Sequence, residues 1–82
     1  MDSNVSPKQN VRLIRLAEVK RRTGLSTSSI YAALSRGEFP ARVRINTTGT
    51  VVGWVEDEIK QFILDRIAAR DRRYALIGNL EK

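Results

Sequence analysis

The sequence contains no cysteine and no histidine. Without cysteine it forms neither disulfides nor thiolate metal sites, and without histidine it lacks the commonest metal ligand and general base. We therefore expect no metal and no organic cofactor. Three acidic residues stand together at positions 56–58, where the start of a helix explains them, and no phosphate-binding glycine loop accompanies them. The sequence thus argues against an enzyme.

Long apolar segments are also missing. The sequence has no run of about 18 apolar residues that would span a bilayer, and its first ten residues hold no apolar stretch of signal-peptide length. We therefore expect no membrane partner and a cytoplasmic location. A chain of 82 residues is long enough for one domain with a small core, which leaves room for stabilisation by a partner or a second subunit.

The net formal charge of +6 is unevenly distributed. Residues 8–44 contain nine basic and two acidic residues, a net charge of +7, whereas residues 55–65 contain four acidic residues and one basic residue. A strongly basic surface is suited to a polyanion, although solvated basic faces are also common without one. The amino-terminal half is therefore the candidate for nucleic-acid contact.

Local signals predict two short helices in this basic half. Residues 17–23 place apolar side chains on one helical face, and Gly24 directly after them is suited to a left-handed C-cap. Ser26 is a good N-cap for a second helix over residues 27–36, which Gly37 closes. Two helices joined by a short glycine-containing turn are typical of a helix-turn-helix.

A β-hairpin and a third helix follow. Residues 42–45 alternate basic and apolar side chains, residues 46–50 have the composition of a turn, and residues 51–54 resume the apolar run. Residues 55–69 then show the clearest helical periodicity of the chain. Over residues 11–70, these elements predict a mainly α domain with a small β-hairpin, a winged helix-turn-helix of the excisionase or MerR kind.

The two ends of the chain lie outside this predicted domain. Residues 1–10 are polar without periodicity, which predicts a flexible arm, and the next few residues support a short extended lead-in at most. Residues 71–82 are predicted to form a C-terminal tail. Its apolar patch at residues 74–77 is too short for a core of its own, so it either docks on the domain or contacts a second copy.

The second predicted helix carries the first candidate binding residues. Helices that enter the major groove present side chains to base edges near their N-terminal end, and hydroxyl groups both donate and accept there. Thr27, Ser28 and Ser29 fit this role. Tyr31, one turn further on, is placed to reach a phosphate, unless it only covers the edge of the core. The remaining candidates on this helix are Ala32, Ser35 and Arg36.

The hairpin supplies a second group of candidates. Arg42 and Arg44 alternate along one strand and are suited to lie along a DNA backbone or in the minor groove. Alternating charges on an edge strand also resist aggregation, so this pattern has a second explanation. Thr47 and Thr48 form the small polar tip.

The end of the first helix is also basic. Lys20 and Arg21, followed by Arg22, either contact phosphates or only complement the helix dipole. The aromatic residues Trp54 and Phe39, in contrast, are predicted to lie in the core and not to stack on bases.

As a set, these motifs resemble the AlpA family of prophage transcriptional regulators. The resemblance rests on Thr23-Gly24-Leu25-Ser26-x-x-Ser29-Ile30-Tyr31, then Gly37-x-Phe39-Pro40, then Gly53-Trp54 before an acidic helix start. It implies a small DNA-binding protein that controls the expression of integrase or excisionase genes, or that itself acts as an excisionase bending DNA at an attachment site. Family members often carry a basic residue early in the recognition helix, where Thr27 and Ser28 are neutral, so no target sequence is transferred.

Two hypotheses of different classes remain. The first is sequence-specific binding of double-stranded DNA at the nucleoid, as a homodimer or a cooperative oligomer, with a phage integrase as a further possible partner. The second is a protein-interaction adaptor, in which the helix pair and the apolar tail recruit a recombinase or a polymerase. Alanine variants of Ser28 and Tyr31 separate the two hypotheses. Loss of partner binding with DNA affinity intact favours the adaptor, and loss of DNA affinity with partner binding intact favours DNA recognition.

Overall fold

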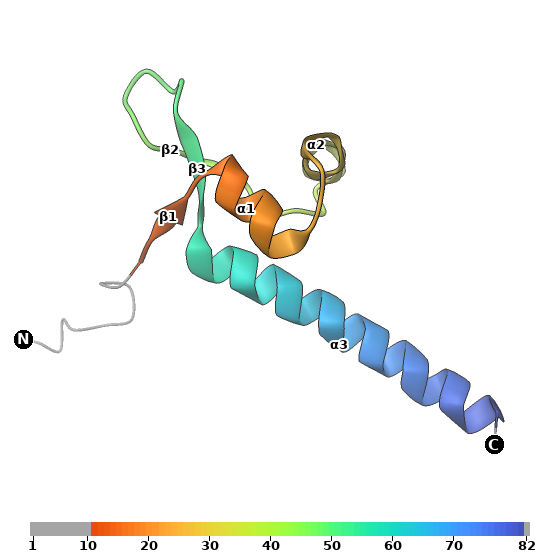
Figure 1. Cartoon of the computed structure of the whole chain (residues 1–82). Helices are drawn as coiled ribbons and strands as arrows, with labels where there is room; N and C mark the ends of the chain where they lie inside the picture. Colours follow the sequence, from red (N-terminus) through yellow and green to blue (C-terminus); the bar gives the residue numbers. More distant parts are fainter. Residues whose placement is uncertain (1–10, 82) are drawn as a thin grey trace, which may run out of the picture.

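A computed structural model describes residues 11–81, with side chains through residue 75. Its elements are β1 (Leu13–Ile14), α1 (Leu16–Thr23), α2 (Thr27–Ser35), β2 (Val43–Arg44), β3 (Val52–Val55) and α3 (Glu56–Glu81) (Figure 1). The first five elements form a small body, from which the far end of α3 projects. The prediction of a mainly α fold with a hairpin is confirmed. The expected N-terminal arm, residues 1–10, lies outside the described residues.

The predicted helix ends are present in the structure. Gly24 follows α1 with φ of 77°, and its N–H donates to the carbonyl of Lys20 at 2.8 Å. The Ser26 hydroxyl then accepts from the backbone N–H of Ser29 at 3.1 Å, which satisfies one free donor of the first turn of α2. After α2, Gly37 adopts φ of 72°. Each junction of the helix-turn-helix is thus fixed by residues within it.

The sheet has one strand more than the hairpin predicted from the sequence. Its order is β1-β3-β2, with both pairings antiparallel. Ile14 in β1 lies opposite Trp54, and Val43 in β2 lies opposite Gly53. The short extended lead-in is therefore the outer strand that makes β3 the centre of the sheet.

Gly53 is required by this central position. A Cβ at this residue would lie 2.9 Å from the carbonyl oxygen of Ile14 and 2.9 Å from the Cδ1 atom of Ile45. Contacts this short force atoms to move, so only glycine allows the neighbouring strand and the Ile45 side chain to approach so closely.

The core forms where the sheet, α1, α2 and the start of α3 meet. Its buried residues are Ile14, Val19, Ile30, Phe39, Trp54 and Ile59. Trp54 is fully buried, and its indole N–H donates to the carbonyl of Pro40 at 2.9 Å. The Phe39 ring meets the Trp54 ring edge-on at 6.2 Å between centroids. Both aromatic residues therefore belong to the core, as predicted.

Helix α3 is longer than the sequence pattern indicated. It continues past residue 69 to Glu81, so the predicted tail begins as a continuation of this helix. The apolar stripe weakens where contact with the body ends, but the residues that follow, such as Arg70, Arg72 and Ala75, are good helix formers. Within the described residues, no helix is both long enough and apolar enough to cross a membrane.

Candidate nucleic-acid interface

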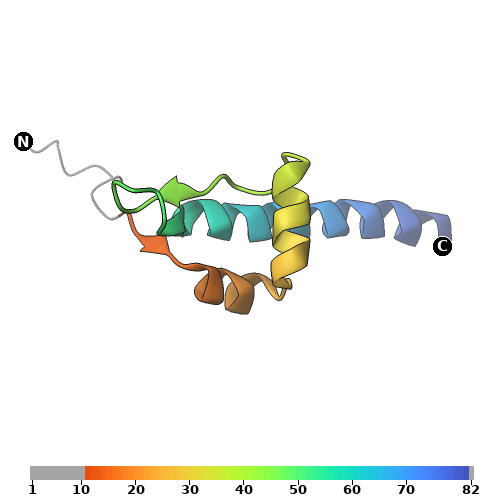
Figure 2. The same ribbon diagram turned by 90° about the horizontal axis from the view of Figure 1, so that it is seen from above.

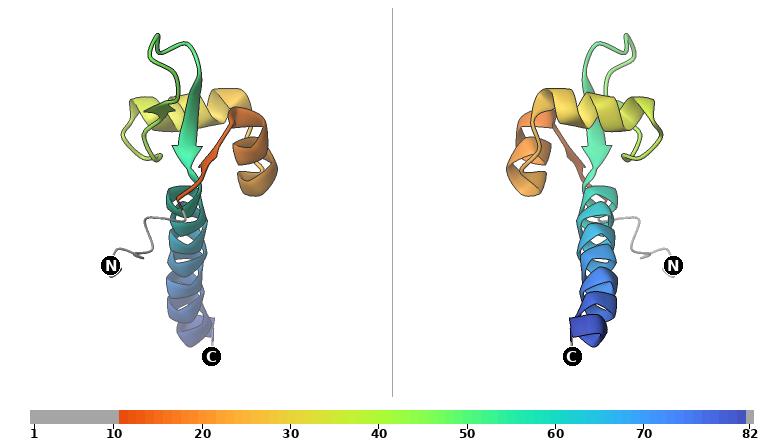
Figure 3. Two further views of the ribbon diagram at one scale, coloured as in Figure 1. Left: turned by 90° about the vertical axis from the view of Figure 1, so that its left-hand side faces the viewer. Right: turned by 90° about the vertical axis from the view of Figure 1, so that its right-hand side faces the viewer.

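Helix α2 and the loop between β2 and β3 lie on one side of the molecule. Figure 1 shows both above α3, and in Figure 3 both lie at the top of the view. Seen from above, α2 runs across the direction of α3 (Figure 2). We call the surface formed by α2 and residues 42–50 the α2–wing face. On this face, Tyr31 and Ser35 of α2 lie beside Arg42 and Arg44 of the hairpin.

The hydroxyl groups at the start of α2 are partly engaged with one another. The Ser26 hydroxyl donates to that of Ser29 at 3.0 Å and lies 3.3 Å from that of Ser28. Ser28 and Ser29 are exposed, and Thr27 is half-buried. Because Ser29 helps to hold the cap, Ser28 is the serine of this group best placed for an outside partner.

The later residues of α2 also differ in whether their side chains have partners within the chain. Tyr31 is 38% exposed and Ala32 is exposed. The Ser35 hydroxyl donates to the carbonyl of Ala32 at 2.7 Å, and the Nε atom of Arg36 lies 2.9 Å from the Glu38 carboxylate. Ser35 and Arg36 therefore have partners within the chain, which the linear sequence did not reveal.

The two wing arginines border a hollow beside α2. The guanidinium carbon of Arg42 lies 5.4 Å from the centroid of the Tyr31 ring, a cation–π contact between the wing and α2. The side chain of Arg44 lies over Gly49, so closely that a Cβ there would be 3.3 Å from its Cδ atom. The hollow is lined by Tyr31, Leu34, Ser35, Ala41, Arg42, Arg44, Gly49 and Val52. Both guanidinium groups thus border one concave surface.

Asn46 holds the wing loop in shape. Its side-chain amide donates to the hydroxyls of Thr48 and Thr50 at 2.8 Å each, and its side-chain carbonyl accepts from the N–H of Val51 at 3.0 Å. Thr47 and Thr48 are exposed at the tip, as expected. Sequence reasoning missed Asn46, although asparagine at the start of a turn often bonds to nearby backbone groups.

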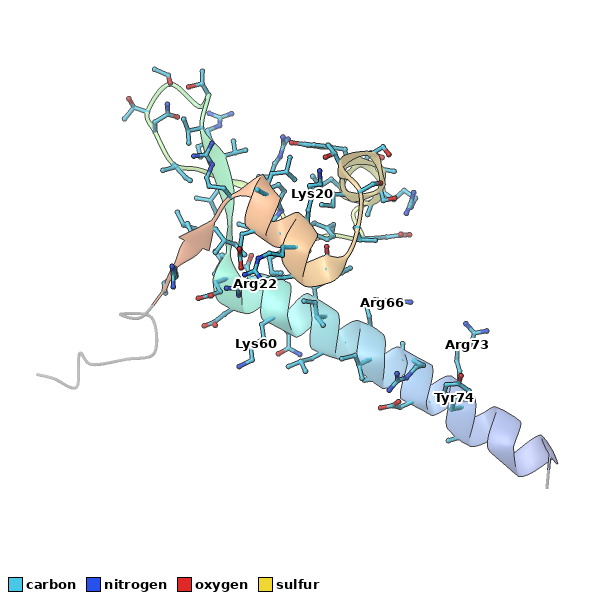
Figure 4. All side chains as sticks on the ribbon, in the orientation of Figure 1. Lys20, Arg22, Lys60, Arg66, Arg73 and Tyr74 are labelled. Carbon is cyan, nitrogen blue, oxygen red and sulfur yellow. The ribbon has the colours of Figure 1, made fainter. Side chains whose placement is uncertain are left out.

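The basic residues at the end of α1 are mostly used inside the molecule. The Nε atom of Arg21 donates to Glu18 at 3.0 Å, and Arg22 lies 2.6 Å from Glu18 and 2.8 Å from Glu56. The hydrogen bonds from Arg21 and then Arg22 lower the pKa of Glu18 to about 2, and the bond to Glu18 raises the pKa of Arg22. Lys20 is exposed and projects on the opposite side of α1 from Arg22 (Figure 4).

The described part of the chain holds no group of three or more acidic side chains placed to bind a metal ion. Its three helices and three-stranded sheet, with the hairpin beside the second helix, define a winged helix-turn-helix protein.

Comparison with known proteins identifies the family. The family model described as "Prophage CP4-57 regulatory protein (AlpA)" matches residues 12–67, and the chain belongs to this family. It is also 40% identical over 63 residues to "Uncharacterized protein ORF88" of Enterobacteria phage P4, covering 77% of this chain and 69% of that protein. No solved structure matches. The family match includes the helix-turn-helix, the wing and the first half of α3, and it confirms the resemblance seen in the sequence motifs.

Proposed function

We propose that the chain binds double-stranded DNA in a sequence-specific manner, with α2 in the major groove and the wing against the neighbouring backbone. The observation that supports this most directly is the α2–wing face, where Tyr31 and Ser35 of α2 and two arginines of the wing line one hollow. Membership of a family of prophage regulatory proteins agrees with it.

On this proposal the candidate residues have three roles: contact with bases, contact with phosphates and support of the surface. Ser28 and Thr27 meet base edges, because their small hydroxyl side chains let the helix approach closely. Arg42, Arg44 and Lys20 meet phosphates, together with the hydroxyl of Tyr31. Four other candidates have partners within the chain and mainly support this surface: Ser29, Ser35, Arg36 and the hydroxyl of Thr48. Arg21 is paired with Glu18 within α1.

We further propose that the DNA targets control integrase or excisionase genes of a mobile element. Both the family description and the phage P4 relative place similar proteins in prophages or phages. The protein would act in the cytoplasm at the nucleoid, without a cofactor and without catalysing a reaction.

The test begins with selection of target duplexes from a random library by the full chain. Affinity for a selected duplex and for a scrambled one is then measured between 50 and 200 mM salt. With about six phosphate contacts, the log–log slope for the selected duplex should be about −5. Equal affinity for both duplexes, or a flat salt response, contradicts the proposal and leaves the adaptor hypothesis.

The same duplexes separate regulation from excision. If the protein is an excisionase, a circular-permutation assay should show a strong bend, and the selected sequence should occur at an attachment site. If it is a transcriptional regulator, the sequence should occur at a promoter. For substitutions of the wing arginines Arg42 and Arg44, the matched control is Arg72→Ala in α3, because it removes an arginine far from the α2–wing face.

A further inference from the structure

One face of α3 is left uncovered by the body. Positions on this face recur at alternating spacings of three and four residues, which is the period of a helix that packs along another helix. We call it the α3 seam; its residues are Asp57, Lys60, Leu64, Ile67, Asp71 and Tyr74, and all of them are exposed. Its three apolar members, Leu64, Ile67 and Tyr74, are 46%, 42% and 66% exposed.

We propose that the α3 seam binds the seam of a second copy of this chain, with the two helices antiparallel. When the midpoint of contact lies between residues 65 and 66, Leu64 faces Ile67 of the partner subunit. In the same register Lys60 faces Asp71 of the partner subunit. The two-fold symmetry repeats both contacts, so the centre of the interface is apolar and an ion pair lies on each side of it.

The charges on the seam select this orientation. In a parallel pair, Lys60 would face the partner's Lys60 and Asp71 would face the partner's Asp71, and both contacts are repulsive. The charges along the rest of α3 also favour the antiparallel orientation. Residues 56–65 include four acidic residues and one basic residue, whereas residues 66–74 include four arginines and one aspartate. An antiparallel pair sets the acidic half of each helix against the basic half of the other.

The body leaves room for this partner. At 3.6 residues per turn, the seam lies roughly a third of a turn around α3 from the core residues Ile59 and Phe62. Lys60 projects from α3 on the side away from α1, whereas Arg66 and Arg73 project on the side of α1 (Figure 4). A groove lined by Arg22, Glu56, Asp57, Lys60, Ile63 and Leu64 borders the seam. In the proposed register, the second half of the partner helix would lie along this groove.

The same geometry keeps the α2–wing faces accessible. The two-fold axis of an antiparallel helix pair is perpendicular to the plane that contains both helices. Because each body is attached about a third of a turn away from its seam, both bodies lie on the same side of that plane. The two helix-turn-helix units therefore lie on one side of the helix pair, an arrangement that suits binding to an inverted repeat.

A nucleic acid is the competing occupant of α3. Its second half carries Arg66, Arg70 and Arg73, which line a shallow pocket together with Ala69 and Tyr74. Arg66 and Arg73 of this basic stripe project on a different side of α3 from Lys60, whereas Arg70 is paired with Asp71 of the seam at 2.8 Å. A polyanion would meet Asp57 and Asp71 on the seam itself, so the observations favour a second copy there.

Cross-linking tests the register directly, because the natural chain has no cysteine. Lys60→Cys and Asp71→Cys are made separately, and each is oxidised alone and in an equal mixture. In the antiparallel register the two positions face each other, whereas residue 60 of one chain lies about 16 Å along the axis from residue 60 of the other. A disulfide needs Cα atoms within about 7 Å. We expect a cross-linked dimer from the mixture and none from either variant alone.

A charge exchange tests the ion pairs. Sedimentation equilibrium from about 1 µM to about 1 mM covers the affinities expected for a small interface. Lys60→Glu and Asp71→Lys should each weaken association at least about tenfold, and the double variant should restore it. Arg72→Glu makes the same charge change as Lys60→Glu on another side of α3 and should have a much smaller effect.

Three outcomes would overturn the proposal. They are a monomer at every concentration, cross-linking of either cysteine variant alone, and failure of the double variant to restore association. If the chain is monomeric and Arg66→Glu lowers its affinity for DNA, α3 binds nucleic acid instead. The cross-linking and sedimentation measurements are made without DNA, so the dimer and the proposed function fail separately.

Discussion

Arg42 lies over the ring of Tyr31, with its guanidinium carbon 5.4 Å from the ring centroid. This contact joins the wing to α2 across the hollow that the two elements share. A cation–π contact at an exposed site contributes about 0.5–1 kcal/mol, which is enough to bias the position of a wing arginine. The arginine is thus held near α2 before any partner arrives.

Replacing Arg42 by alanine should therefore weaken DNA binding and reduce the salt slope by about one, because one phosphate contact is lost. Tyr31→Phe keeps the ring beneath the guanidinium and removes only the hydroxyl. Titration of labelled duplex with both variants separates the two roles of the tyrosine. Affinity unchanged in Tyr31→Phe would show that the hydroxyl makes no contact with phosphate.

Ser26→Ala should lower the free energy of unfolding by about 1 kcal/mol, because the N-cap acceptor for α2 is lost. Ser28→Ala is the matched control, since it removes a hydroxyl from the same turn without removing the cap. It should leave stability nearly unchanged while lowering affinity for DNA. Urea denaturation of both variants checks the first expectation. Equal destabilisation by the two substitutions would contradict it.

Asn46→Ala should loosen the wing loop without unfolding the protein. The substitution removes the acceptor for the Val51 N–H and the donor to Thr48 and Thr50. We expect faster amide hydrogen exchange confined to the loop, and a loss of global stability of about 1 kcal/mol or less. Asn46→Asp keeps the acceptor and loses the donor, so its exchange should be intermediate. Exchange rates like those of the unsubstituted chain would show that Asn46 does not hold the wing loop in shape.

Gly53→Ala should destabilise the protein by about 1–3 kcal/mol, because the added methyl overlaps a backbone carbonyl and the Ile45 side chain. Adding Ile45→Ala removes one of the two obstacles and should not rescue stability, since the carbonyl of Ile14 remains. Thermal unfolding of the single and double variants provides the measurement. Full rescue would mean that Ile45 alone is responsible.

The pH dependence of stability should include a contribution from Glu18. Its pKa in the folded chain, about 2, is below the ordinary value of 4.5, because Arg21 and then Arg22 donate hydrogen bonds to the carboxylate. Because the pKa is lower in the folded chain, the ionised carboxylate stabilises the folded state at pH values above the ordinary pKa. This contribution is lost as the pH falls from 4.5 toward 2. The stability difference between the unsubstituted chain and Glu18→Gln should therefore narrow over that interval. A constant difference in urea midpoints would contradict this.

The parts of the fold that were predicted from sequence depend on local signals. Gly24, Ser26 and Gly37 act within one turn of the helix ends that they determine, so the helix-turn-helix was visible in the linear order of residues. Strand β1 was not visible as a sheet strand, because its pairing depends on β3, about 40 residues further along the chain. The length of α3 was missed because its second half has no apolar stripe packed against the body.

The candidate interface shows the same division. Residue types and spacing identified the surface, since small hydroxyls and alternating arginines stand out in sequence. They did not show which members of the surface are already paired. Arg21 and Ser35 each have a partner within the chain, and Asn46 shapes the loop without standing out by charge or hydrophobicity. Those distinctions depend on side-chain geometry that the linear sequence does not contain.

Strand β3 ends at Val55 and α3 begins at the next residue, Glu56. The N–H of Glu56 donates to the carbonyl of Arg12 at 2.7 Å, and its carboxylate lies 2.8 Å from Arg22. The junction therefore has no linker that would let α3 swing relative to the helix-turn-helix. In the proposed dimer, the separation of the two α2 helices is then a fixed length. Inserting one base pair between half-sites rotates one of them by about 35° relative to the other, so the protein would select its targets by the length of the spacer as well as by base sequence.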